Sequence, residues 1–150
     1  MIIRALHQFL EHYHITNSRK DKLLDALVNT RLWRTALWML CLIVGYLALS
    51  PSPPQGASLG WDKLNHAAAF AAMAFAAVLA LRNLRWHRRY VALGLVGYGG
   101  AIEIAQWFVP GRSCEWGDLL ADCIGIAVGA QLATVMLRVV LRLASRTHQH

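Results

Sequence analysis

The stretch Leu32–Leu49, with the sequence LWRTALWMLCLIVGYLAL, decides the fold. Its one charged residue, Arg34, stands near the start, where a long side chain can reach the polar surface of a membrane while its stem stays in the apolar layer. A helix needs about 17–25 apolar residues to cross the hydrocarbon core of a bilayer. The stretch has this length and therefore predicts a membrane-spanning helix.

Three further apolar stretches of similar length follow, over residues 64–81, 90–109 and 119–140. The first of these is rich in alanine, which suits close packing between membrane helices. The composition agrees, because the chain is 57% hydrophobic and only 15% charged, whereas a soluble domain has roughly 25% charged residues. We expect an all-α fold, a four-helix transmembrane bundle over residues 32–140 in the lipid bilayer.

The positions of the basic residues predict the orientation of the spans. Of the 15 lysines and arginines, all but Lys63 and Arg112 lie before or at the start of the first span, between the second and third spans, or at the end of the fourth. Positive charge is retained on the cytoplasmic side of a membrane. We therefore expect both termini in the cytoplasm, and we read the net charge of +7 as a membrane signal rather than a sign of nucleic-acid binding.

Two cytoplasmic segments flank the expected bundle. In residues 1–31, apolar residues recur at helical spacing, namely Ile2, Ile3, Leu6, Phe9, Leu10 and Tyr13. This spacing predicts an amphipathic helix that lies on the membrane surface or against a partner. Residues 141–150 are expected to form a basic tail.

Polar residues gather near the outward ends of the expected spans. Glu115 belongs to this cluster, and the eight residues that we expect to bind a ligand are Asp62, Lys63, His66, Glu103, Gln106, Arg112, Asp118 and Asp122. Residues three or four apart share a helix face, so Asp62 neighbours His66 and Asp118 neighbours Asp122. A carboxylate inside a membrane needs a partner, and for Glu103 we expect Lys63, Arg112 or His66. Ionisable groups at such depth indicate function, although helix capping by Asp62 and Asp118 and stapling of the helices are structural alternatives.

Other chemistry has no clear sequence signal. Cys41, Cys114 and Cys123 form no CxxC pair, and His66, Glu103 and Asp118 have no metal-ligand spacing, so we expect neither a metal site nor a cofactor. No activated serine is evident, and catalytic residues stay unassigned. The pattern Gly125-x-x-x-Gly129 predicts close helix packing, either within the chain or in a homo-oligomer.

Four motifs in order resemble the VanZ-like family of small bacterial membrane proteins, whose name comes from a member linked to teicoplanin resistance. They are Asp62-Lys63-Leu64-x-His66, Glu103-x-x-Gln106, Pro110-Gly111-Arg112-Ser113 and Asp118-Leu119-x-Ala121-x-x-x-Gly125. The resemblance covers about residues 32–140, and it implies a bacterial inner-membrane protein with a role in the cell envelope. Family members typically have Asn where this chain has Asp122.

Three functions fit these observations. The first is a protein whose outward-facing polar pocket, built from the eight polar residues above, binds an envelope lipid or glycan and influences glycopeptide sensitivity. The second is a membrane-embedded enzyme that acts on such a molecule through acid–base chemistry of His66 and nearby carboxylates. The third is a structural partner in an envelope complex, docked through residues 1–31.

Overall fold

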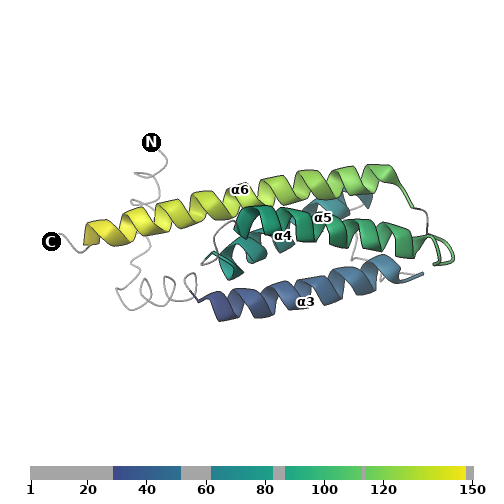
Figure 1. Ribbon diagram of the computed structural model, residues 1–150, viewed down its shortest axis with the longest axis horizontal. Coiled ribbons are helices and arrows are strands. Elements are labelled where there is room, and N and C mark those ends of the chain that lie inside the picture. Colours follow the sequence, from purple (N-terminus) through teal and green to yellow (C-terminus); the bar gives the residue numbers. More distant parts are fainter. Residues whose placement is uncertain (1–28, 52–61, 83–86, 113, 148–150) are drawn as a thin grey trace, which may run out of the picture.

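The computed structural model describes residues 29–51, 62–82, 87–112 and 114–147. Within these ranges the chain is all-α, as predicted, with four helices: α3 (Thr30–Leu49), α4 (Asp62–Ala80), α5 (His87–Gln106) and α6 (Trp116–Thr147) (Figure 1). The amphipathic helix expected near the N-terminus lies outside the described residues.

The helix ends follow from local sequence. The side chain of Asn29 caps α3 by accepting hydrogen bonds from the backbone N–H groups of Arg31 and Leu32. Helix α5 ends at Gln106, three residues before the expected end of the span at residue 109, and the chain then turns through Gly111 at a φ of +80°. Helix α6 continues past residue 140 to Thr147, since no proline or glycine interrupts it there.

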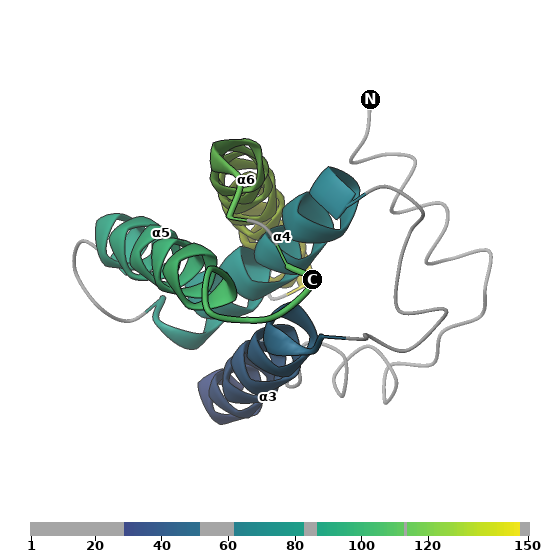
Figure 2. The same cartoon turned by 90° about the vertical axis from the view of Figure 1, so that its right-hand side faces the viewer.

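Consecutive helices run in opposite directions, so that α4 and α6 are parallel. The Nε of Arg34 donates to the carbonyl of Ala80 at 3.4 Å, and the Sγ of Cys41 lies 3.9 Å from the Sδ of Met73, which sets α3 antiparallel to α4. Seen along the bundle, α4 lies between the other three helices (Figure 2). The start of α3 and the end of α6 lie at the same end of the bundle (Figure 1).

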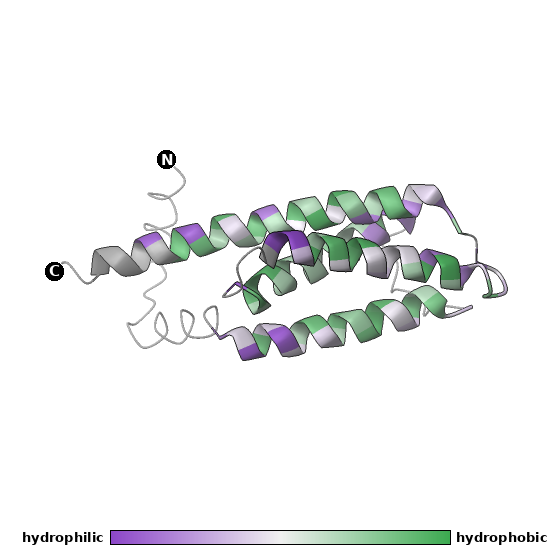
Figure 3. Cartoon of the chain, viewed as in Figure 1, coloured by the Kyte–Doolittle hydropathy of each residue, from purple (hydrophilic) through white to green (hydrophobic). Residues whose placement is uncertain are grey.

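The four helices differ in how deeply they are buried. Most of α4 from Phe70 to Ala80 is buried, whereas α3, described along its whole length, has no buried residue. Apolar residues run along the length of the bundle, and hydrophilic residues gather toward the helix ends (Figure 3). Three helices, α3, α4 and the Trp116–Val140 part of α6, are long and apolar enough to cross a membrane. Helix α5 is less apolar, because glycines and the pair Glu103 and Gln106 dilute its apolar residues.

Helix α6 approaches α4 closely at two glycines. A Cβ atom built on Gly125 would overlap the carbonyl of Ala67, and one on Gly129 would overlap the carbonyl of Ala71. These atoms belong to helix backbone, which cannot move aside as the end of a side chain can. The small-residue pattern of α6 therefore packs within the chain, which was one of its two expected uses.

We expect Gly129→Ala to destabilise the protein, because its new methyl group pushes α6 away from α4. Overpacking of this kind costs about 1–3 kcal/mol, and it should appear as a lower midpoint of thermal unfolding in detergent. Gly97→Ala is the matched control, since a Cβ there meets nothing within 4 Å. Equal midpoints for the two variants would contradict the packing described here.

Candidate functional site

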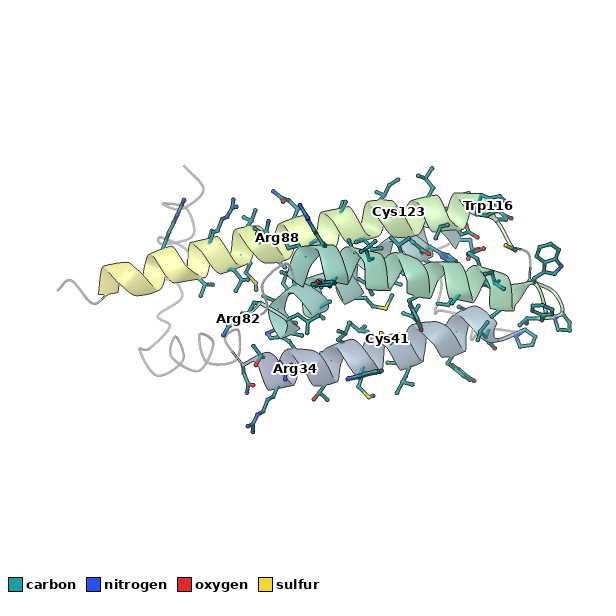
Figure 4. All side chains as sticks on the ribbon, in the orientation of Figure 1. Arg34, Cys41, Arg82, Arg88, Trp116 and Cys123 are labelled. Atoms are coloured by element: carbon teal, nitrogen blue, oxygen red, sulfur yellow. The ribbon has the colours of Figure 1, made fainter. Side chains whose placement is uncertain are left out.

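The five acidic side chains that the structure describes all lie at one end of the bundle. Asp62 opens α4, Glu103 lies in the last turn of α5, and Glu115, Asp118 and Asp122 lie just before or within the first turns of α6. Lys63, His66 and Arg112 belong to the same end. Arg34, Arg82 and Arg88 lie toward the opposite end, away from Trp116 (Figure 4).

Lys63 joins α4 to the start of α6. Its Nζ lies 2.8 Å from the Oε2 of Glu115 and 3.2 Å from the Oδ1 of Asp118. Asp118 is only 3% exposed. Helix α6 already begins at Trp116, so the carboxylate of Asp118 binds Lys63 from within the first turn rather than capping the helix. Gly117 makes room for this bridge, because a Cβ there would lie 3.0 Å from the Nζ.

His66 forms a second link between the same helices, one turn deeper. Its Nδ1 lies 3.0 Å from the Oδ1 of Asp122, and both residues are buried. When Asp122 is ionised, its carboxylate can only accept, and the Nδ1–H of His66 then donates this hydrogen bond. A ring nitrogen of His66 and carboxylate oxygens of Asp62 and Asp118 lie within 4.8 Å of one another. Asp62 and His66, which are four residues apart on α4, thus lie on the same face of the helix, as their spacing predicts.

Glu103 has a partner that differs from the three expected ones. Its Oε2 accepts a hydrogen bond of 2.9 Å from the backbone N–H of Glu115. None of the three expected partners bonds directly to Glu103, because Lys63 is held by Glu115 and Asp118, and His66 by Asp122. Of the three, His66 lies within electrostatic range of Glu103. The contact ties the end of α5 to the segment that leads into α6.

Three buried oxygens at this end lack a hydrogen-bond donor among the described residues. They are the Oε1 of Glu103, the Oε1 of Gln106 and the Oδ2 of Asp122. Gln106, 1% exposed, uses its Nε2 to donate to the carbonyl of Ala48 at 3.0 Å. The Oδ2 of Asp122 faces Gly99 on α5, where a Cβ would lie only 2.6 Å from it. These oxygens can accept hydrogen bonds that the described residues do not supply.

Arg112 is half-buried in the segment between α5 and α6. Its backbone N–H donates to the carbonyl of Val109 at 3.1 Å. Within ranges 29–51, 62–82, 87–112 and 114–147, its guanidinium makes no ion pair or hydrogen bond. Six of the eight predicted residues thus make hydrogen bonds or ion pairs at this end of the bundle, and Asp62 lies close to His66 and Asp118. The side chain of Arg112 takes part in none of these contacts.

Two further residues take part in this arrangement: Glu115, which was expected in the polar cluster but not chosen as a binding residue, and Gly99, which was expected only to allow close helix packing. Glu115 binds Lys63 with its side chain and Glu103 with its backbone, and Gly99 leaves space for the carboxylate of Asp122. Glu115 stands inside the polar stretch 110–118, which is a usable signal. Gly99 has no comparable sequence signal, because it is one of several glycines in α5.

The thiol of Cys114 lies in the same segment, outside the helices. Partial burial raises its pKa, and the negative charge of Glu103, a hydrogen bond with the Glu103 side chain and the negative charge of Asp118 raise it further. Cys114 is therefore less ionised at neutral pH than an ordinary thiol, and it should react slowly with electrophiles there.

Comparison with known proteins now adds the family. Neither a curated protein nor a solved structure matches the chain. The family model described as VanZ/LLP1 matches residues 16–138, starting earlier than the resemblance at about residue 32 had indicated. The match spans most of the chain, and with it the helices that build the polar end, so this protein belongs to the VanZ/LLP1 family.

Proposed function

We propose that the polar end of the bundle faces outward from the bacterial cytoplasmic membrane and binds the head group of an envelope component. The membrane location is supported by three helices that are apolar enough to span a bilayer and by membership of the VanZ/LLP1 family. The concentration of arginines at the other end supports a cytoplasmic position for that end and for both termini.

Helix α5 is proposed as the fourth span. It packs beside α4 and α6, and its polar residues Glu103 and Gln106 turn into the bundle, while Leu93 and Ile104 are exposed as lipid-facing residues would be. A helix that hides its polar groups among its neighbours can cross a bilayer with fewer apolar residues than an isolated one.

The observation that carries the binding proposal is the set of three buried oxygens without donors, on Glu103, Gln106 and Asp122. Each buried acceptor left unsatisfied costs about 1–3 kcal/mol. A ligand with hydroxyl or amino groups would repay this cost by donating to them. Lys63 is already held by two carboxylates, so of the two cations at this end Arg112 is better placed to attract a phosphate. A lipid-linked sugar phosphate combines both kinds of group.

We expect Glu103→Ala and Arg112→Ala each to weaken binding of a polyprenyl-phosphate-linked sugar about tenfold, as loss of about 1.4 kcal/mol implies. Native mass spectrometry of the purified protein with this lipid measures the effect, and teicoplanin sensitivity of cells reports it in vivo. Arg138→Ala, an exposed cation nearer the other end of α6, is the control. Unchanged binding in both variants, with membrane expression intact, would refute the proposal.

The orientation can be tested with cysteines. In a Cys41→Ser, Cys123→Ser background, we expect a membrane-impermeant maleimide to label Cys114 on intact bacterial cells. Because its pKa is raised, labelling should accelerate as the pH rises past about 8.5, the usual cysteine value.

The control for orientation places the thiol at the other end of the bundle. Arg142→Cys, with all three native cysteines replaced by serine, should react only after the cells are permeabilised. Labelling of Cys114 and of Arg142→Cys from the same side would mean that α6 does not cross the membrane, and the reverse pattern would mean that the orientation is inverted.

One observation favours a second candidate, an enzyme with acid–base chemistry. A histidine whose Nδ1 is held by a carboxylate presents its Nε2 as a general base, and His66 is held in this way by Asp122. If so, the purified protein converts the labelled lipid-linked sugar, and His66→Gln abolishes turnover while Cys123→Ser, at an exposed position of α6, does not. Tight binding of the lipid with no product formed from any lipid tested would refute the enzymatic role and leave binding as the only one of the two functions.

A further inference from the structure

We infer that Asp62, His66 and Asp118 form a binding site for a divalent transition-metal ion such as Zn²⁺. Their ligand atoms, one from each residue, lie within 4.8 Å of one another. In a tetrahedral site, two ligands that each lie about 2.0–2.2 Å from a zinc ion are about 3.3–3.6 Å apart. The three side chains thus need to close by up to about 1.5 Å to hold the ion, a movement that changes of side-chain rotamer can supply.

The orientation of His66 fits this role. Asp122 accepts from the Nδ1 of His66, which fixes the ring and leaves the Nε2 as the nitrogen that can bind a metal. Histidines that bind metals commonly donate their other ring N–H to a carboxylate, an arrangement that orients the ring and raises its basicity. Asp122 is 1% exposed; its Oδ1 bonds to His66, and its Oδ2 faces Gly99.

The charges at this end call for a further cation. Asp62, Glu103, Glu115, Asp118 and Asp122 carry five carboxyl groups; among the described residues, Lys63 contacts two of them, and His66 pairs with Asp122 when it is protonated. The buried Glu103, 5% exposed, lies within electrostatic range of Asp118 and His66, and its Oε1 has no donor. A divalent ion beside Asp118 and His66 would compensate these charges.

The three residues can be reached from outside the bundle. Asp62 is exposed and Lys63 is half-exposed, so an ion can enter from the polar end of the bundle. Lys63 binds the Oδ1 of Asp118, so the Oδ2 would be the oxygen that binds the metal. Three protein ligands leave at least one position open on a tetrahedral ion, and a phosphate oxygen is a suitable fourth ligand.

The presence of an imidazole ligand selects the kind of ion. Magnesium and calcium prefer all-oxygen surroundings, whereas imidazole suits zinc and similar transition metals. The residues were not recognisable as a metal site from their spacing, since Asp62 and His66 come from one helix and Asp118 from another.

The inference does not rest on the proposed head-group binding, and the metal alone tests it. Chelator-treated, full-length protein in detergent is titrated with Zn²⁺ and, in parallel, with Mg²⁺ by isothermal calorimetry. We expect a Zn²⁺ site that Asp62→Asn weakens at least tenfold; Asp62 is exposed, so this variant keeps the fold. His66→Gln should abolish the preference for Zn²⁺ over Mg²⁺.

The matched control is Glu115→Gln, which removes one negative charge from the same end and leaves the three ligands in place. It should change the Zn²⁺ affinity less than threefold. Equal weakening by Asp62→Asn and Glu115→Gln would show a general attraction to negative charge and overturn the inference, as would equal Zn²⁺ binding by wild type and Asp62→Asn. Either result would leave the binding of the lipid-linked sugar to be judged by its own experiment.

Discussion

The close parallel packing of α6 on α4 is the contact on which the rest of the structure depends. Gly125 and Gly129 bring the backbone of α6 against the carbonyls of Ala67 and Ala71. Once these contacts are set, the register of the preceding turns is set too, so that Lys63 meets Asp118 and His66 meets Asp122. A shift of α6 by one residue would turn its side chains by about 100° and carry both carboxylates away from their partners.

The direction of the two helices explains why acidic residues are tolerated at this end. Because α4 and α6 are parallel, both of their N-termini, the positive ends of their dipoles, lie beside the carboxylates. Asp62 and Asp118 stand in the first turns and benefit directly. The effect fades within one turn, so Asp122 needs His66. Glu103, near the C-terminus of α5, gains nothing from its own helix and depends on the backbone N–H of Glu115.

The helices were predictable because membrane-length apolar stretches are a local property of the sequence. Partners across helices were not, because they depend on register. Lys63 was one of three expected partners of Glu103, yet the register of α4 on α6 places it against Asp118 and Glu115. The end of α6 was underestimated for a related reason: the arginines after Val140 ended the apolar pattern, but they are good helix formers and the helix continues to Thr147.

The alternative that these residues only staple the helices together makes a different demand on the structure. Polar contacts between helices stabilise the bundle when every buried polar atom has a hydrogen-bond partner. The Nζ of Lys63, the Nδ1 of His66 and the Nε2 of Gln106 each have one. The remaining oxygens of Glu103, Gln106 and Asp122 have none among the described residues. Polar contacts between membrane helices contribute only about 0.6 kcal/mol on average, less than the cost of about 1–3 kcal/mol for one unsatisfied acceptor. A leucine or alanine at these positions would pack the helices together without leaving a buried acceptor unsatisfied. Because the cost of an unsatisfied acceptor exceeds the gain from a polar contact, a bound ligand explains these residues better than a purely structural role does.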